Sequence, residues 1–143
     1  MSVELPVSPV DSLIRSQAGD LRVSAGAAEA LARQIQTEGA AIAATAAQQT
    51  EADGRKTIMV ADFGDLSVPD RESLTLPIAP VDRIARLEVD DRFRVAQDAR
   101  LALAGRLEDR AATVAAGARE LAEHAGRRTI QSEDIDLFVE LCG

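Results

Sequence analysis

The sequence predicts an all-α protein made of two tandem copies of one unit, in which a long helix lies between two short ones. Hydrophobic residues make up 46% of the 143 residues, but aromatic residues only 2%. Alanine and leucine must therefore fill the core, which favours closely packed helices over a sheet. The repeat is direct: LPVSPVDSLIR (5–15) returns as LPIAPVDRIAR (76–86), and DGRKTIMVADF (53–63) returns as AGRRTIQSEDI (125–135).

The repeat also sets the expected domain bounds. The offset between the copies is 71 residues at the start and 72 after the first loop, which indicates one inserted residue in that loop of the second copy. Each copy has about 65 residues. The stretch GDLSVPDRESLT (64–75) is typical of a linker. We expect one unit at 1–66, a linker at 67–75 and a second unit at 76–143. Because one such copy is only marginally stable alone, we expect both to share one core as an intramolecular pseudo-dimer.

The first element of each copy is a short helix. Prolines stand at its start, where a missing N–H costs nothing. In the second copy the helix places Val81, Ile84, Ala85 and Leu87 on one face. A short loop follows, QAGDLRV in the first copy and EVDDRFRV in the second.

The second element is a long Ala-rich helix that begins near Ser24 or Ala96 and ends near the glycine of GRKTI or GRRTI. About 27 residues at a rise of 1.5 Å give a length of about 40 Å. Its apolar residues recur as one stripe, at Leu103, Leu107, Val114 and Leu121 in the second copy and at Leu31, Ile35 and Ile42 in the first. VAD or SED then opens a third, short helix, with Ser132 expected as N-cap and Asp134 in the first turn.

The charge pattern is unusual. The net charge is −8, and Lys56 is the only lysine among 16 basic residues. Such acidic, Ala-rich chains suggest a salt-loving organism, since at about 1 M salt the Debye length is only about 3 Å; an acidic protein of a mesophile is the alternative. No apolar run reaches the roughly 18 residues of a membrane span, and the first residues predict no signal peptide. Cys142, the single cysteine, suits a reducing cytoplasm.

No pattern of residues indicates catalysis or a metal centre, and we expect no enzyme and no cofactor. His124 is the only histidine and has no nucleophile beside it in a recognisable motif, so an interface or surface role is expected. GRKT (54–57) is similar to a phosphate-binding P-loop, but Arg55 separates the glycine from the lysine. The scarcity of aromatic residues argues against nucleic-acid binding by base stacking.

The motifs LPIAPVDRI, RV, HAGRRTI and SEDI, in this order and at this spacing, resemble an archaeal histone. The second copy matches densely and the first more loosely but in register. The whole chain therefore resembles the doublet histones of salt-loving archaea, in which two histone folds are fused. The resemblance implies a handshake pseudo-dimer that binds double-stranded DNA in the cytoplasm, on the nucleoid, without a cofactor.

The resemblance also implies roles for particular residues. DNA would follow a rim formed by paired loops, with an arginine of each copy in the minor groove (Arg22, Arg94), a supporting threonine (Thr57, Thr129) and a basic phosphate contact (Lys56, Arg128). The first helices would add Arg15, Arg83 and Arg86, with Ser12 standing where a further basic residue is usual. Two arginines would instead form structural pairs with aspartates, Arg55 with Asp62 and Arg127 with Asp134.

Dimers of this family stack end to end, and the resemblance implies that the two ends of this chain differ. In the second copy the stacking residues fall on Leu121, His124, Asp134 and Leu137, which suit such a contact. In the first copy they fall on Gln49, Ala52, Asp62 and Asp65, which lack the apolar surface and the histidine. We expect one docking end per chain, and hence a pseudo-tetramer of two chains.

Three functions stay open at this point. The first is a DNA-binding histone that bends or wraps duplex DNA with little sequence specificity and contributes to chromatin organisation. Its weakness is electrostatic, because affinity from phosphate contacts falls steeply with salt. The second is a low-abundance transcriptional regulator at selected promoters. The third is a histone-fold protein-interaction module that binds no DNA, against which the intact Arg22, Arg94, Thr57 and Thr129 argue.

Overall fold

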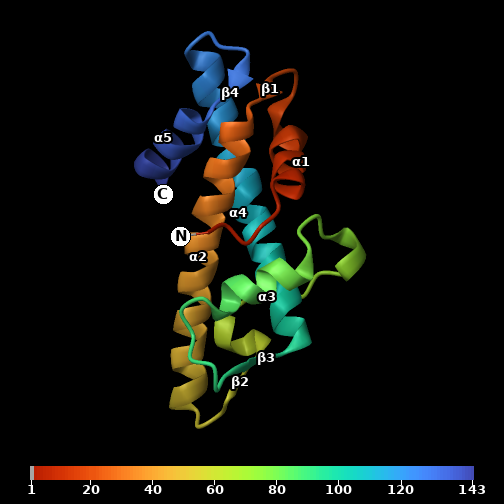
Figure 1. Ribbon diagram of the computed structural model, residues 1–143, viewed down its shortest axis with the longest axis vertical. Helices are drawn as coiled ribbons and strands as arrows, with labels where there is room; N and C mark the ends of the chain where they lie inside the picture. Colours follow the sequence, from red (N-terminus) through yellow and green to blue (C-terminus); the bar gives the residue numbers. More distant parts are fainter. Residues whose placement is uncertain (1) are drawn as a thin grey trace.

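The computed structural model describes residues 2–143 as helices arranged along two long, crossing rods (Figure 1). The first copy contains α1 (Val7–Ala18), β1 (Arg22–Val23), α2 (Ala25–Ala52), β2 (Thr57–Ile58) and the 3-10 helix η1 (Val60–Phe63). After a second 3-10 helix, η2 (Arg71–Ser73), the second copy contains α3 (Ile78–Arg86), β3 (Arg94–Val95), α4 (Gln97–His124), β4 (Thr129–Ile130) and α5 (Ser132–Cys142).

The two long helices begin and end as expected. Each has 28 residues, and they are preceded by Ser24 and Ala96. The Ser24 hydroxyl accepts a hydrogen bond from the backbone N–H of Ala27 (3.1 Å), which caps α2. Both helices stop just before a glycine in the left-handed region, Gly54 at φ 72° and Gly126 at φ 73°, where other residues would be strained. The prediction of a mostly helical fold is confirmed.

The buried apolar residues of both copies form one continuous core. The short helix α1 packs against both α2 and α4, and α3 does the same. Near the middle of the molecule, Ile84 and Leu107 of the second copy close over Gly39 of the first. A Cβ on Gly39 would lie only 2.9 Å from Ile84 Cγ2 of α3 and 3.1 Å from Leu107 Cδ1 of α4, so the small residue lets both helices pack closely on α2 here.

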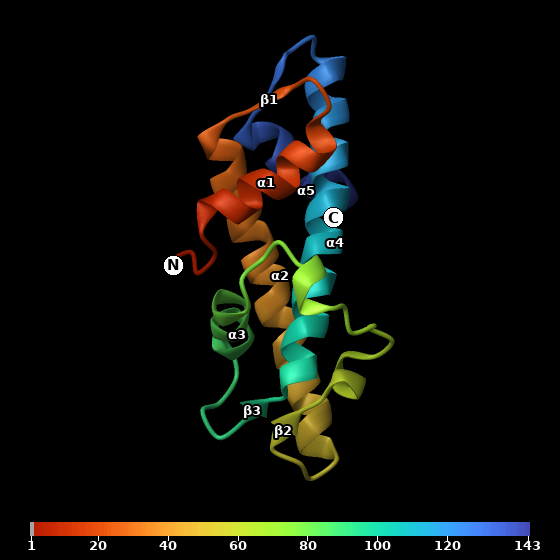
Figure 2. The same cartoon turned by 90° about the vertical axis from the view of Figure 1, so that its right-hand side faces the viewer.

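The four two-residue strands join the copies at two places. β1 pairs in parallel with β4, and β2 pairs in parallel with β3, so that each pair contains one strand from each copy. Figures 1 and 2 show the two pairs at opposite ends of the long axis, with α1 and α3 along the molecule between them.

Three details differ from the sequence-based expectation. The third helix of the first copy is only the four-residue η1, because Gly64 turns the chain at φ 88°. The N-cap of α5 is Gln131, and Ser132 is its first helical residue. Leu87 does not share the buried face of α3: it follows the last residue of that helix and exposes 40% of its surface.

Candidate nucleic-acid interface

The strand pairs bring candidate residues of the two copies side by side. Arg22 is the register partner of Thr129, and Arg94 is the register partner of Thr57. The backbone N–H of Arg22 donates to the carbonyl of Arg128 (2.9 Å), and that of Arg94 donates to the carbonyl of Lys56 (2.8 Å). Each end of the molecule therefore gathers one arginine from one copy with a threonine and a second basic residue from the other.

Four basic side chains at these two ends are open to a ligand. Arg22, Lys56, Arg94 and Arg128 are all exposed. Within residues 2–143 the structure gives none of them an ion pair, whereas many other arginines of the chain have one. In an acidic protein, two small basic clusters at opposite ends are the natural places for an anion.

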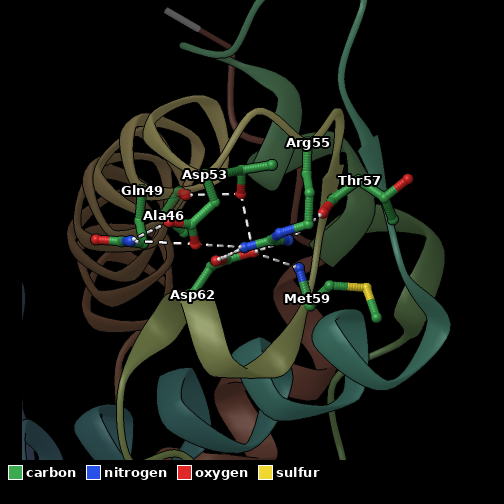
Figure 3. A network of polar contacts seen from close by, with 8 residues as sticks. Ala46, Gln49, Asp53, Arg55, Thr57, Met59 and Asp62 are labelled. Carbon is green, nitrogen blue, oxygen red and sulfur yellow. Dashed lines mark hydrogen bonds and ion pairs between the residues drawn. The ribbon is translucent and has the colours of Figure 1, made fainter.

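Arg55 directs its guanidinium to Asp62 within the first paired loop (Figure 3). Its Nη2 donates to Asp62 Oδ1 (2.6 Å) and its Nη1 to Asp62 Oδ2 (3.1 Å), and Nη1 also donates to the carbonyl of Thr57 (3.1 Å). Asp62 Oδ2 accepts further hydrogen bonds from the Met59 N–H and the Thr50 hydroxyl, both at 2.8 Å. The Arg55 guanidinium, aided by these donors, lowers the pKa of Asp62 to about 2.

Arg127 has the same place in the second copy. Its two terminal nitrogens donate to the two oxygens of Asp134 at 2.6 and 2.5 Å, and Nη1 also donates to the carbonyl of Thr129 (3.3 Å). Burial raises the pKa of Asp134, but the hydrogen bonds from Arg127 and from the Gln131 N–H outweigh it, and the pKa lies below its usual range. Both Arg–Asp pairs thus fix the backbone that carries Thr57 or Thr129.

Within residues 2–143, the candidate DNA-binding arginines of the first helices form ion pairs, unlike Arg22, Arg94 and Arg128 of the paired loops. Arg15 pairs with Asp11 (2.5 Å), Arg86 with Asp82 (3.1 Å) and Arg83 with Glu4 (2.9 Å). All three arginines are exposed, so these pairs are weak. A phosphate would nevertheless have to displace a carboxylate at each of them.

The two ends that could dock another chain are also unlike. In the second copy His124 is exposed, Leu121 is half-buried, and Leu137 exposes 41% of its surface. Asp134 exposes only 1% of its surface, and both oxygens of its carboxylate accept hydrogen bonds from Arg127, at the spacing of seven residues that predicts this pair.

The corresponding positions of the first copy carry residues of a different chemistry. Gln49, Ala52 and Asp65 are exposed there, and Asp62 is buried with Arg55. The backbone differs as well, because α5 has 11 residues and η1 only four.

Sequence reasoning missed several contacts that the structure brings together. Glu4, Gln36 and Thr50 were not singled out, although Glu4 reaches a candidate DNA contact and Thr50 reaches Asp62. A comparison of the two copies position by position carries a signal for Glu4, since the acid and its arginine occur at one pair of positions and are both missing at the other.

Neither a metal centre nor a membrane-spanning helix is found in the part of the chain that the structure describes. Residues 2–143 contain no cluster of His, Cys, Asp and Glu that could hold a metal ion. None of their helices combines the length and the apolar character needed to cross a bilayer.

Comparison with known proteins gives a consistent result. The chain is 48% identical over 65 residues to a chain of the archaeal histone HAN1 of Thermococcus zilligii, a match that covers 46% of this chain and 94% of that protein. The solved histone of Methanopyrus kandleri matches with a TM-score of 0.69 and 25% identity over 92% of this chain and 90% of that one. The protein ttk003001566 of Thermus thermophilus shares the fold at the same TM-score of 0.69 and 19% identity, over 93% of each chain.

The family profile covers both copies. Residues 3–64 and 74–139 each match the family described as histone-like transcription factor (CBF/NF-Y) and archaeal histone. One range lies in each half of the chain, and together they take up most of the 143 residues. The chain therefore belongs to the family of histone-like transcription factors (CBF/NF-Y) and archaeal histones.

Proposed function

We propose that this chain is a duplex-DNA-binding histone that bends or wraps DNA with little sequence specificity and contributes to chromatin organisation. The observation that carries the proposal is the composite basic cluster at each end of the molecule, Arg22 with Arg128 and Thr129, and Arg94 with Lys56 and Thr57. The relatives of the chain named above as histones support the same assignment.

The physics of the two clusters suits DNA. An arginine enters a narrow minor groove, where the negative potential is strongest, and loop N–H groups and basic side chains take the flanking phosphates. Such contacts read the backbone and the deformability of the duplex and not its base edges. Because the two clusters lie at opposite ends of a long molecule, a duplex that touches both has to follow the surface between them, and we infer that it bends.

We also propose that the chain is a doublet histone, in which units 1–66 and 76–143 form an intramolecular handshake pseudo-dimer joined by a linker at 67–75. The pairing of each loop with a loop of the other copy and the shared core support this arrangement. The Methanopyrus kandleri histone, matched over 90% of its length by this single chain, supports it too. The net charge of −8 supports a salt-loving source.

Self-association would use the second copy only. The exposed Leu137 beside Leu121 and His124 forms a docking end, and the corresponding end of the first copy has Asp65 and a shortened helix. Two chains would then join into a pseudo-tetramer on DNA and stop there, whereas a histone with two equal ends could continue.

A second function has an observation in its favour. The arginines of the first helices are paired with carboxylates of the chain, which lowers the affinity for any DNA. Packaging by a weakly binding histone would require high abundance, and at low abundance the chain would instead act as a regulator at selected promoters. Genome-wide occupancy together with cellular copy number separates the two: broad coverage supports packaging, and sparse promoter peaks support regulation.

The direct test of DNA binding and bending uses a duplex of mixed sequence with a fluorophore at each end. Added protein is expected to raise fluorescence anisotropy and to increase energy transfer between the two ends, because a bent duplex brings its ends closer. Binding without increased transfer would leave a DNA-binding protein that does not bend. The absence of binding at low salt would favour a histone-fold module that acts only on other proteins.

A further inference from the structure

The segment before α1 is fixed to the long helix α2 by a buried glutamine. Gln36 exposes 2% of its surface, its Oε1 accepts a hydrogen bond from the backbone N–H of Glu4 (2.7 Å), and its Nε2 donates to the carbonyl of Ser2 (2.9 Å). The next residue, Leu5, is also buried, at 3% exposure. The backbone of Glu4 therefore has a set position on the body of the protein.

That position brings the side chain of Glu4 to the other copy. Glu4 Oε1 accepts a hydrogen bond from Arg83 Nε at 2.9 Å, across 79 residues of sequence. Because the backbone of Glu4 is already ordered by Gln36 and Leu5, only the side chains of Glu4 and Arg83 have to be ordered to make the ion pair. This lowers the entropic cost that usually makes an exposed ion pair negligible.

In the other half of the molecule a side chain of the long helix α4 also fixes the segment before the short helix, but no ion pair follows from it. Glu108, 72 residues after Gln36, accepts hydrogen bonds from the backbone N–H groups of Thr75 (2.5 Å) and Leu76 (2.6 Å). At the offset of 71 residues, Thr75 corresponds to Glu4 and Ser12 corresponds to Arg83. The acid Glu4 and the arginine Arg83 therefore occur together, whereas both corresponding positions carry hydroxyl residues. This joint difference favours a matched ion pair over a chance contact.

We propose that Glu4 is a built-in competitor of DNA phosphate for Arg83, so that this arginine is occupied in the free protein and contributes little to DNA binding. The inference rests on the proposed function, and it changes the expected role of one residue in it. Arg83 belongs to α3, and Figure 2 shows α3 between the strand pairs at the two ends of the molecule. A duplex that touches both basic clusters would pass this helix. The intramolecular carboxylate acts there as an autoinhibitory contact.

The competition has a characteristic dependence on salt. Each phosphate contact contributes about −0.9 to the slope of log affinity against log salt concentration. Removal of the Glu4 charge frees Arg83 for one more phosphate, so the slope becomes steeper by about 0.9, and affinity at about 0.1 M salt rises roughly fivefold beyond the effect of net charge. The gain disappears towards about 1 M salt, since the contact is then screened.

The experiment measures duplex binding by anisotropy over a salt series for Glu4→Gln, Arg83→Gln and the double variant. Glu120→Gln is the matched control, because Glu120 is an exposed carboxylate on α4 with no ion pair in the part of the chain that the structure describes. We expect Glu4→Gln to bind roughly fivefold more tightly than Glu120→Gln at low salt. Arg83→Gln alone should change affinity less than about twofold, and in that background Glu4→Gln should give no gain over Glu120→Gln.

A further variant tests the support at constant charge. Gln36→Met removes both hydrogen bonds that hold the segment 2–4, and circular dichroism checks that it remains folded. We expect a gain in affinity in the same direction as Glu4→Gln but smaller; no gain would show that the pair does not depend on the glutamine and would overturn that part of the proposal.

The possible failures are distinct. If the unmodified protein binds duplex and Glu4→Gln gains no more than Glu120→Gln, the competition is refuted and the proposed function stands. The same holds if Arg83→Gln alone weakens binding as much as the loss of a loop arginine does. If no variant binds duplex even at low salt, the proposed function and this inference are both wrong.

Discussion

Thr57 of the first copy stands directly opposite Arg94 of the second, in the parallel pairing of β2 with β3. Thr129 and Arg22 have the same relationship at the other end, with the copies exchanged. Neither copy alone therefore carries a complete basic cluster. If these clusters hold DNA, the loss of one arginine should weaken one whole end of the molecule.

We expect the double variant Arg22→Ala, Arg94→Ala to bind duplex at least tenfold more weakly at about 0.1 M salt, because two phosphate-linked contacts are lost. The slope of log affinity against log salt should become shallower by about 1.8, that is about 0.9 for each arginine. Titrations by fluorescence anisotropy at several salt concentrations measure both quantities.

The matched control removes the same charge elsewhere. Arg33 and Arg106 are exposed arginines on α2 and α4, away from the strand pairs. Arg33→Ala, Arg106→Ala should change affinity far less than the loop variant. Equal losses from both double variants would mean that net charge, and not the paired loops, governs binding.

The Arg55–Asp62 pair should make stability sensitive to acid. The pKa of Asp62 is lowered to about 2, so the carboxylate stabilises the fold above its ordinary pKa of about 4, and this contribution is lost as the pH falls from about 4 to about 2. The shift corresponds to about 2 kcal/mol at neutral pH. Asp62→Asn should lower the free energy of unfolding by about this amount at pH 7 and flatten its decline in acid.

Urea unfolding at a series of pH values measures this effect. Asp65→Asn is the control, because Asp65 is exposed in the same segment and no ion pair is found for it within residues 2–143. It should change stability by less than about 0.5 kcal/mol. An acid transition that is the same with and without the Asp62 carboxylate would contradict the prediction.

Much of this fold could be predicted from the sequence, because its strongest signals are local. The apolar stripe and the Ser24 and glycine boundaries specify the long helices, and both are seen in the structure. The spacing of seven residues between Arg55 and Asp62 is likewise local, and the same spacing in the second copy gives the same bidentate geometry.

The third helix of the first copy could not be predicted in this way. Its first residues correspond to those of α5, and an aspartate near the start of each accepts a backbone N–H. Besides Gly64, which corresponds to Asp136 in α5, the packing differs. In the second copy Phe138 lies on Gly117, and a Cβ there would come within 2.0 Å of the ring. The corresponding positions in the first copy, at the offset of 72 residues, are Leu66 and Thr45, so that the glycine on which the ring lies has no counterpart on α2.

The ion pair of Arg83 could not be predicted from the sequence either, whereas those of Arg15 and Arg86 join residues only four apart. Glu4 and Arg83 are far apart in the chain and meet only because α3 of the second copy lies near the start of the first. From its position in the family pattern Arg83 is expected to contact DNA, whereas in the structure it pairs with the carboxylate of Glu4.

The contact of Phe138 with Gly117 leads to a prediction about stability. Gly117→Ala should lower the free energy of unfolding by about 1–3 kcal/mol, because the added methyl group has to displace the ring and α5 with it. Thermal unfolding measures the loss. In a Phe138→Ala background the same substitution should become neutral or stabilising, since alanine is the better helix former.

Gly26→Ala is the control for helix propensity. A Cβ at Gly26 meets its nearest neighbour at 3.7 Å, an ordinary contact with Ser132. This variant should be neutral or gain a few tenths of a kcal/mol. A similar loss from both glycine variants would point to a backbone effect common to the two helices and not to the ring of Phe138.

The last prediction concerns the two docking ends. Leu137→Asp places in the second copy the residue type that the first copy has at Asp65, and we expect it to abolish the association of two chains, because a charge would have to be buried in an apolar contact. Sedimentation velocity, in the presence and absence of duplex, measures the assembly. Leu87→Asp is the matched control, since Leu87 is a leucine of nearly equal exposure that lies outside this end.

The reverse substitution should not have the reverse effect. Asp65 follows Gly64, outside the short η1, whereas Leu137 lies within α5. Asp65→Leu therefore restores an apolar side chain without the helix that would present it, and we expect assemblies on long duplex still to stop at two chains. Filaments that grow without limit in the Asp65→Leu variant would show that side-chain chemistry alone makes the ends unequal. Filaments already formed by the unmodified chain would show that the ends are equivalent and that the single docking end is wrong.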